Sequence, residues 1–176
     1  MFDAYSRYYD LLYQDKDYAA EVAYVDALLQ RHGIGGRELL EFGSGTGRHG
    51  RLLAERAYRV TGIERSAAMV ARAQPSPGFQ CLAGDIRTVQ LGRTFDAVLS
   101  LFHVVSYQVG NADVQAVFAR AAEHLRTGGI FVFDVWYSPA VLAQRPAVRI
   151  KRFAAGGWRS PALPSPICCP TPTGWM

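Results

Sequence analysis

The stretch Glu41-Phe42-Gly43-Ser44-Gly45-Thr46-Gly47 decides the fold of this chain. Residues 38–43 form a short apolar run that stops at a glycine, which is typical of a buried strand followed by a turn. A glycine-rich turn between a strand and a helix lets the backbone approach a ligand closely and points free helix N–H groups at it. An isolated Gly-x-Gly is equally typical of a tight structural turn, so the neighbouring elements must decide between the two.

The flanking segments alternate between strand and helix patterns. Helices are expected over residues 18–31, 49–57, 66–73 and a segment that Asn111 caps and Gly128-Gly129 ends, and strands over 38–43, 58–64, 79–83, 95–102 and 130–135. This alternation predicts an α/β fold: a Rossmann-like, doubly wound, mainly parallel sheet with helices on both faces. In such a sheet, ligands bind at the carboxyl ends of the strands.

Acidic side chains stand at three of these strand ends. Glu64 ends the second predicted strand, where a carboxylate can accept both ribose hydroxyls of an adenosine ligand or can simply be solvated. Asp85 follows the third strand and can accept from an adenine amino group or cap a helix. Glu41 lies just before Gly43, where its charge repels a pyrophosphate and attracts an ammonium or a sulfonium.

Other chemistries have less support. The residues from Gly45 to Gly50 spell the Gly-x-Gly-x-x-Gly fingerprint of NAD-binding proteins, but that fingerprint begins at the strand end, which here is Gly43. The four histidines lack metal-ligand spacing, so no metal site is expected. Ser44 does not match the Gly-x-Ser-x-Gly nucleophile turn.

Five blocks stand in the order and spacing of a known family. They are Glu41-x-Gly43-x-Gly45-x-Gly47, Gly62-x-Glu64-x-Ser66-x-x-Met69, Gly84-Asp85-Ile86, Phe95-Asp96-Ala97-Val98 and Leu125-x-x-Gly128-Gly129-x-Phe131. Through them the chain resembles class I S-adenosylmethionine-dependent methyltransferases, and its opening, Tyr8-Tyr9-Asp10-Leu11-Leu12-Tyr13, resembles the branch that acts on amino sugars and other small molecules. The resemblance implies methyl transfer, by in-line displacement, to an N, O or C atom of a small-molecule acceptor.

The resemblance also implies roles for individual residues. The residues that it assigns to S-adenosylmethionine are Tyr9, Tyr13, Glu41, Gly43, Ser44, Gly45, Gly47, Glu64, Arg65, Met69, Asp85, Ile86 and Leu101. The glycine turn would hold the methionine half, with Glu41 beside it, and Glu64 would hold the ribose. Tyr9 and Tyr13 would belong to a lid over the sulfonium, a cation that aromatic faces attract, although amphipathic packing explains these tyrosines equally well.

Two residues after the fourth predicted strand are candidates for catalysis. His103 and Tyr107 are expected to face the acceptor, and a histidine can take a proton near neutral pH. A base is needed only where the acceptor carries a proton that must leave. A capped or core histidine is the alternative at position 103.

Composition excludes several other classes. The chain has 176 residues, 49% hydrophobic and 19% charged, which fits one domain with a real core. No apolar run reaches ~18 residues, the start lacks the layout of a secretory signal, and the cysteines form no disulfide framework, so a cytoplasmic location is expected. The net charge of +4 comes from residues 135–176, which hold basic residues and no acid, so nucleic-acid binding is not expected.

The sequence divides into three parts. We expect an N-terminal lid and first helix over residues 1–33, the S-adenosylmethionine-binding domain over 34–153 and a disordered, Pro-rich tail over 154–176. Because closely spaced prolines cannot donate to a strand ladder, we expect the C-terminal strands of the family's sheet to be missing and the chain to be aggregation-prone and weakly active or inactive. A genuine Pro-rich tail, an inactive cofactor-binding remnant and an NAD-dependent oxidoreductase are the alternatives.

Overall fold

The computed structural model describes Tyr9 and residues 13–32, 34–143, 149–151, 154–155, 158–159 and 163–165. The chain divides into two compact units between Val135 and Trp136.

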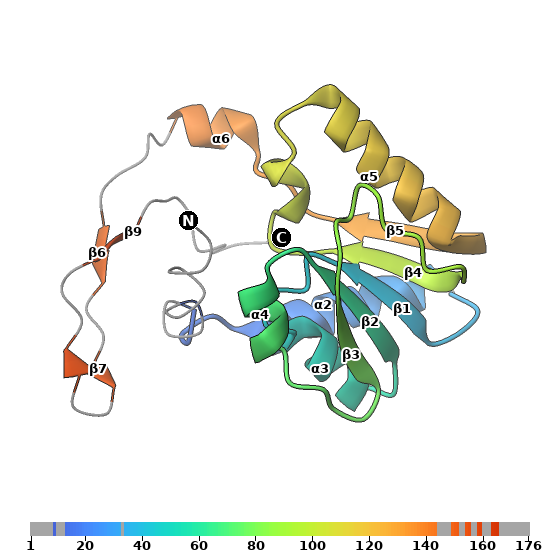
Figure 1. Cartoon of the computed structure of the whole chain (residues 1–176), viewed down its shortest axis with the longest axis horizontal. Helices are drawn as coiled ribbons and strands as arrows, with labels where there is room; N and C mark the ends of the chain where they lie inside the picture. The colour runs from blue at the N-terminus through green and yellow to red at the C-terminus, as the bar shows by residue number, and fades with distance from the viewer. Residues whose placement is uncertain are drawn as a thin grey trace. The chain divides into compact units, whose positions relative to one another are not determined.

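The first unit is built on a five-stranded sheet. Its strands are β1 (Glu38–Phe42), β2 (Arg59–Glu64), β3 (Phe79–Ala83), β4 (Phe95–Ser100) and β5 (Leu125–Phe133). They lie in the order β3-β2-β1-β4-β5, and every neighbouring pair is parallel (Figure 1). The direction in which successive strands are added reverses between β1 and β4. This arrangement confirms the predicted Rossmann-like fold.

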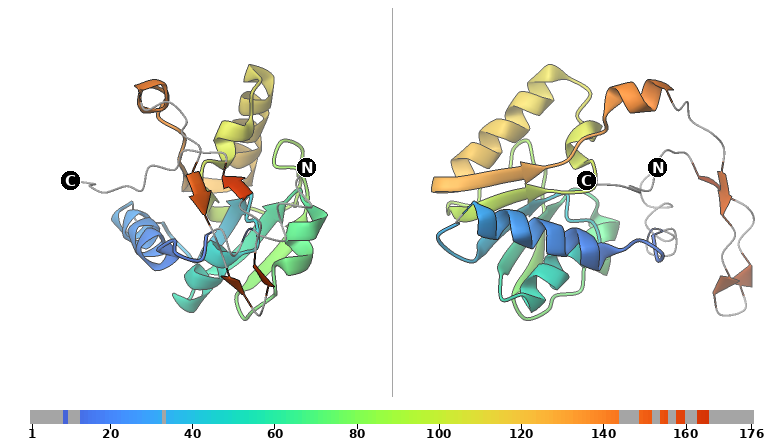
Figure 2. Two further views of the ribbon diagram at one scale, coloured as in Figure 1. Left: turned by 90° about the vertical axis from the view of Figure 1, so that its left-hand side faces the viewer. Right: turned by 180° about the vertical axis from the view of Figure 1, so that it is seen from behind.

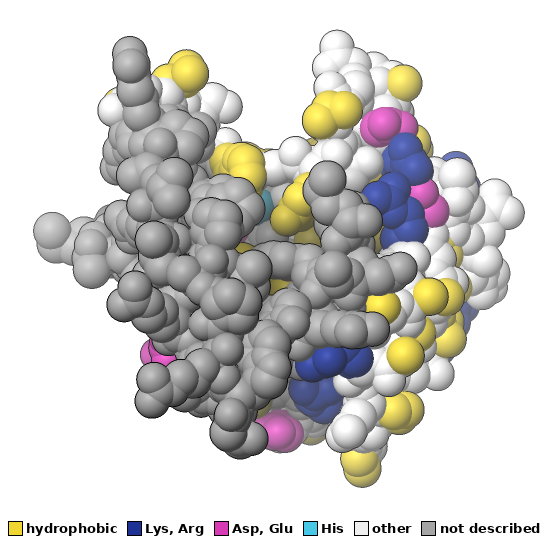
Figure 3. Space-filling model, turned by 60° about the vertical axis from the view of Figure 1, so that its left-hand side comes forward, with side chains coloured by type: hydrophobic (Ala, Val, Ile, Leu, Met, Phe, Trp, Pro, Cys, Tyr) yellow, Lys and Arg dark blue, Asp and Glu magenta, His cyan; other side chains and the backbone are white. Residues whose placement is uncertain are grey.

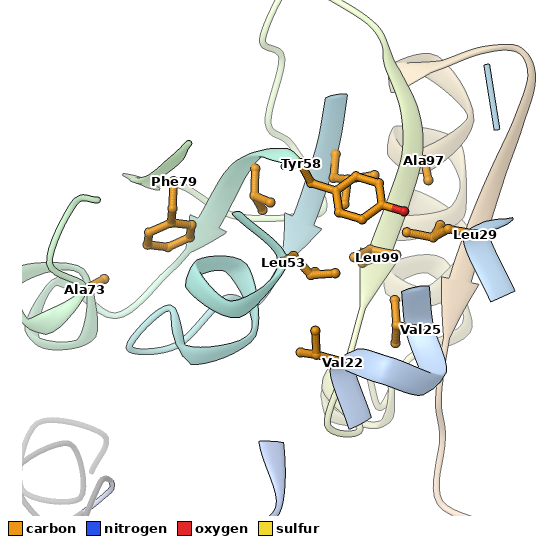
Figure 4. Close-up of a cluster of buried hydrophobic side chains, with 11 residues drawn as sticks. Val22, Val25, Leu29, Leu53, Tyr58, Ala73, Phe79, Ala97 and Leu99 are labelled. Carbon is orange, nitrogen blue, oxygen red and sulfur yellow. The ribbon is translucent and has the colours of Figure 1, made fainter. Parts of the chain in front are cut away.

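Helices cover both faces of the sheet (Figures 1 and 2). The helices of this unit are α2 (Tyr18–Arg31), α3 (Arg48–Glu55), α4 (Ala67–Arg72), the short 3₁₀ helix η1 (Val104–Tyr107) and α5 (Asn111–His124). Successive strand residues point to opposite faces, so Leu39 joins one buried cluster and Leu40 the other. The Leu39 cluster packs against Val22, Val25 and Leu29 of α2 and Leu53 of α3 (Figure 4), and the Leu40 cluster packs against α5.

The chain between α5 and β5 differs from its prediction. Gly110 caps α5 and Asn111 is its first residue, and β5 begins at Leu125 and passes through Gly128 and Gly129. The sequence pattern predicts that these two glycines end the helix, but they lie inside β5, which pairs with β4. A Cβ at Gly129 would lie 2.9 Å from the carbonyl oxygen of Asp96 in β4. Glycine there permits the close approach of the two strands.

The second unit contains short elements. Helix α6 covers Ser138–Ala143, β6 (Arg149–Lys151) pairs antiparallel with β9 (Leu163–Ser165), and β7 (Ala154–Ala155) pairs antiparallel with β8 (Trp158–Arg159). The other residues of the predicted tail lie outside the described part of the chain, so its disorder stays a prediction. None of the described helices is long and apolar enough to cross a membrane.

Charged side chains at the surface of the first unit form ion pairs. Arg87 pairs with both Asp85 and Asp113, and Arg120 pairs with Glu123. On the face shown in Figure 3, basic side chains lie beside acidic ones, with hydrophobic side chains scattered among them. Exposed pairs of this kind contribute little to stability, typically less than about 1 kcal/mol each.

Candidate functional site

Two loops meet at the point where the strand order reverses. One follows β1 and contains the glycine turn, and the other follows β4 and contains residues 101–107. The loops are packed together, because a Cβ at Gly43 would lie 2.6 Å from the methyl groups of Val104. In an open α/β sheet this is the position at which ligands bind.

The glycine turn combines packing with open space. Gly43, Gly45 and Gly47 have φ angles of 69°, 56° and 77°, in the left-handed region that favours glycine. A Cβ at Gly47 would lie 2.4 Å from the ring of Phe79, so packing alone excludes a side chain there. At Gly45 the nearest described atom to such a Cβ is the Tyr9 hydroxyl oxygen, 4.0 Å away, so no described side chain excludes a Cβ there.

Glu41 is a buried carboxylate beside this turn. Its side chain is 2% exposed, and its Oε2 atom has no hydrogen-bond partner among the described residues. Burial, together with the negative charge of Glu64, raises the pKa of Glu41 to about 8, although the Gly50 N–H group and Arg51 act in the opposite direction. A buried carboxylate with an unpaired oxygen is a binding group for a cation.

Glu64 forms hydrogen bonds with the backbone of the glycine turn and of the residues before α4. Its Oε2 accepts a hydrogen bond from the Gly45 N–H group at 3.0 Å, and its Oε1 accepts one from the Ser66 N–H group at 2.8 Å. The predicted ribose ligand would therefore share a carboxylate that already orders the backbone. Each carboxylate oxygen has two lone pairs, so both bonds leave acceptor capacity.

A chain of charged groups connects Glu41 with the segment before α2. His49 Nδ1 lies 3.8 Å from Glu41 Oε1, and His49 Nε2 lies 2.8 Å from Glu21 Oε2. Glu21 also pairs with Lys16. Burial acts to raise the pKa of Glu21, but the hydrogen bonds from His49 and Lys16 outweigh it and lower that pKa. Glu41 is thus one end of a partly buried polar network that extends through His49 and Glu21 to Lys16.

Aromatic rings extend from the turn to the β4 loop. The Tyr9 and Tyr13 rings are 4.9 Å apart, and Tyr13 meets Phe102 edge to face at 4.9 Å. Lys16 Nζ lies 3.9 Å from the centre of the Phe102 ring, a cation–π contact within this cluster. Of the two tyrosines predicted for the lid, Tyr9 therefore lies next to Gly45 and Tyr13 lies next to the β4 loop.

The residues predicted to contact the adenosine occupy the neighbouring strand ends. Met69 is buried in α4, Ile86 is buried in the core cluster beneath α5, and Arg65 is exposed. The Asp85 carboxylate is held by Arg87, whose hydrogen bonds lower the pKa of Asp85 to about 2. Asp85 is therefore a charged acceptor with a fixed orientation.

The remaining predicted residues lie at the ends of β1 and β4. Ser44 is buried, with its hydroxyl oxygen 3.3 Å from the Cys81 sulfur, and Leu101 is half-buried directly after β4. His103 Nδ1 lies 2.8 Å from Asp134 Oδ2. Tyr107, in η1, is 63% exposed.

The site brings carboxyl groups and aromatic rings together around the glycine turn. Glu41 and Glu64 supply carboxyl groups, of which that of Glu41 has a pKa raised to about 8, and Tyr9, Tyr13 and Phe102 supply aromatic faces. Among the described residues, no group of three His, Cys, Asp or Glu side chains is placed to hold a metal ion.

A family model described as "Methyltransferase domain" matches residues 39–129, which is more than half of the chain. The chain belongs to this methyltransferase family. The match covers the elements from β1 to the glycines of β5, and so includes both loops of the site. It confirms the family predicted from the five sequence blocks, and it does not favour the NAD-dependent oxidoreductase.

Two curated relatives are amino-sugar methyltransferases by name. The dTDP-3-amino-3,6-dideoxy-alpha-D-glucopyranose N,N-dimethyltransferase of Streptomyces fradiae is 38% identical over 134 residues, which are 74% of this chain and 52% of the relative. The dTDP-3-amino-3,4,6-trideoxy-alpha-D-glucopyranose N,N-dimethyltransferase of Streptomyces venezuelae is 35% identical over 138 residues, 77% of this chain and 58% of the relative. The chain thus spans little more than half the length of these relatives.

Solved structures of similar proteins agree with this family. The sugar N-methyltransferase KedS8 from Streptoalloteichus sp. has a TM-score of 0.75 and 32% identity, and the match covers 84% of this chain and 60% of KedS8. S-adenosylmethionine-bound CalS10, an amino pentose methyltransferase from Micromonospora echinaspora, has a TM-score of 0.73 and 33% identity over 85% of this chain and 64% of CalS10.

Sequence reasoning missed several residues that line or support this site. Phe102 and Asp134 follow strands β4 and β5, and the rule that the carboxyl ends of parallel strands share one edge points to both positions. Lys16 and His49 contact Glu21 of α2 and are brought near the turn only by tertiary packing. No local spacing in the sequence marks that contact.

The raised pKa of Glu41 predicts a pH-dependent cost in stability. In the unfolded chain this carboxyl has its ordinary pKa of 4.5, so between pH 4.5 and about 8 the folded state holds a proton that the unfolded state releases. The free energy of unfolding should therefore fall as the pH rises through this window. Glu41→Gln has no carboxyl group to ionise, so its free energy of unfolding should not fall in this window. At pH 8.5 the variant should melt at least about 2 °C above the wild-type chain, and at pH 4.5 this difference in melting temperature should disappear.

Thermal unfolding at a series of pH values measures this effect. Glu55→Gln, which neutralises an exposed glutamate of α3, is the matched control and should follow the wild-type pH dependence. Equal pH dependence of Glu41→Gln and the wild-type chain would contradict the burial of an ionisable Glu41.

Proposed function

We propose that this chain binds S-adenosylmethionine at the glycine turn and methylates an amino nitrogen of a small sugar-nucleotide acceptor. The observation that carries the proposal is the buried carboxylate of Glu41, with its unpaired Oε2 atom, beside the open space at Gly45. A structural turn needs no such carboxylate, and burying one without a partner is costly. A cationic ligand supplies the missing partner.

The residues present fit this cofactor. When bound, S-adenosylmethionine supplies a methyl group on a sulfonium, which is already activated for transfer to a nucleophile. Glu41 would face the α-ammonium group, Glu64 would accept from the ribose hydroxyls, and Asp85 would accept from the adenine amino group. The rings of Tyr9 and Tyr13 would exclude water and stabilise positive charge.

The amino nitrogen is favoured by the relatives. Both curated relatives described above are named as N,N-dimethyltransferases of dTDP-linked amino sugars. Their shared chemistry, an amine on a nucleotide-linked hexose, supports an acceptor of this class. The in-line geometry that methyl transfer requires can provide much of the acceleration.

A proton must leave the acceptor when an amine is methylated. We propose His103 as the group that receives it, since an imidazole can accept a proton near neutral pH. Its neighbour Val104 packs on Gly43, so the loop that carries His103 lies against the glycine turn. Tyr107, in the same loop, is proposed to contact the acceptor.

Replacing Gly45 should abolish cofactor binding without unfolding the chain. In Gly45→Ala the new methyl group occupies the space that the glycine leaves open, so the Kd for S-adenosylhomocysteine should rise at least tenfold. The left-handed φ of 56° adds strain of about 1–2 kcal/mol. Gly92→Ala has the same strain, at a φ of 64° with nothing within 4 Å, and should lose similar stability but bind normally. Calorimetric titration with S-adenosylhomocysteine measures the Kd of both variants. Equal Kd values for Gly45→Ala and Gly92→Ala would contradict the proposed position of the cofactor.

Replacing His103 should affect turnover more than cofactor binding. In His103→Asn the side chain still tolerates a left-handed backbone, but no imidazole remains to take the proton. With dTDP-3-amino-3,6-dideoxy-α-D-glucose as acceptor, kcat should fall roughly 10²- to 10⁴-fold, while the Kd for S-adenosylhomocysteine stays within a factor of two or so. Mass spectrometry of the methylated product follows turnover. An unchanged kcat would exclude His103 from proton transfer.

A further inference from the structure

The loop after β4 begins with two residues in an uncommon backbone conformation. Phe102 has a φ of 65° and His103 a φ of 62°, and neither is glycine. Left-handed φ angles are rare for residues with large side chains and persist only where surrounding contacts enforce them. The conformation places the Phe102 and His103 rings side by side, with centres 5.8 Å apart.

Asp134 supplies the contacts that hold this conformation. The His103 N–H group donates to both carboxylate oxygens of Asp134, at 3.1 Å and 3.0 Å, and His103 Nδ1 lies 2.8 Å from Oδ2. The Asp134 N–H group donates to the carbonyl oxygen of Ser100 at 3.3 Å, so the carboxylate is anchored to the end of β4. One side chain therefore accepts from the backbone N–H group of His103 and lies within ion-pair distance of its ring.

The pair stands at the edge of the site described above. Val104, next in the chain, packs on Gly43, and Phe102 contacts Tyr13. The His103 ring is 28% exposed and the Asp134 carboxylate 42% exposed, so the imidazole is reachable from solvent.

We propose that Asp134 is a positioning residue that holds His103 in the tautomer with the proton on Nδ1, which leaves Nε2 as the nitrogen that takes the acceptor's proton. This proposal rests on the proposed function, which makes His103 the base. A carboxylate accepts hydrogen bonds and cannot donate them, so the ring nitrogen that faces it must carry a proton.

The electron and proton count follows from this arrangement. The acceptor amine enters as an ammonium: its N–H bond breaks, the electron pair of that bond stays on nitrogen as the lone pair, and the proton forms a new N–H bond at Nε2. That lone pair would then form the N–C bond to the methyl group, while the methyl–sulfur bond breaks and its electron pair goes to sulfur. The resulting imidazolium carries its positive charge beside the Asp134 carboxylate. Burial acts to raise the pKa of Asp134, but the hydrogen bonds from His103 outweigh it and lower that pKa, so the carboxylate is ionised at neutral pH.

Asp134→Asn tests the proposal sharply. The amide oxygen of the new side chain can still accept from the His103 N–H group, which preserves the loop, but its NH₂ group faces Nδ1 and can only donate. Nδ1 must then be the unprotonated nitrogen, and Nε2 carries the proton. Long-range ¹H–¹⁵N spectra of the four histidines near pH 8, assigned with His103→Asn, should report Nδ1–H in the wild-type chain and Nε2–H in the variant. Asp134→Glu, which restores a carboxylate, should return His103 to Nδ1–H.

Kinetics separates positioning from folding. In the dTDP-amino-sugar assay, Asp134→Asn should lower kcat roughly tenfold to hundredfold with the acceptor KM unchanged, less than the loss of the base itself. Glu123→Gln neutralises a similarly exposed carboxylate on α5 and should behave as the wild-type chain. An unchanged tautomer in Asp134→Asn, or a switched tautomer with unchanged kcat, overturns the proposal. A wild-type chain that binds no S-adenosylhomocysteine contradicts the proposed function and leaves the tautomer result to stand by itself.

Discussion

A buried carboxyl group with an unpaired oxygen is costly, and Glu41 places one beside the turn that follows the central strand β1. The cost appears as a pKa raised to about 8. Three neighbouring features accompany this group. His49 lies near one carboxyl oxygen, and the glycines of the turn place no side chain beside it. Glu64 accepts a hydrogen bond from the Gly45 N–H group. The buried, unpaired carboxyl oxygen of Glu41 is explained if a cationic ligand completes the charge balance of the site, and a turn that only connects β1 with α3 does not need this group.

The parallel sheet brings the other groups to this carboxylate. Because the strand order reverses between β1 and β4, the loops after these two strands meet at the edge of the sheet where ligands bind in open α/β folds. The close contact between Val104 and Gly43 holds these two loops together. Asp134, at the end of β5, then reaches the β4 loop and holds His103. Cofactor binding and proton transfer are thus assigned to adjacent strand ends.

Much of this arrangement could be predicted from the sequence, because it rests on local patterns. The strand that ends at Gly43, the apolar stripe of α5 and the acid at position 64 each carry a signal within a few residues. The boundary of β5 could not be predicted, because Gly129 is required by close packing on Asp96 of β4, whereas glycines in sequence suggest a stop. The contacts of Glu21 with His49, and of Asp134 with His103, join residues 28 and 31 positions apart, and no local pattern specifies them. Residues 1–8, at the start of the predicted lid, lie outside the described part of the chain.

The most direct test of this account is the number of protons released when S-adenosylhomocysteine binds. Calorimetric titrations at pH 7 and pH 9, each in two buffers of different ionisation enthalpy, measure that number. A Glu41 with a pKa of about 8 is mostly protonated at pH 7 and must ionise to pair with the ligand's ammonium group. The account predicts release of close to one proton at pH 7, little at pH 9, and none from Glu41→Gln at either pH. Heats that are independent of the buffer at pH 7, or the same proton release from Glu41→Gln, would contradict it.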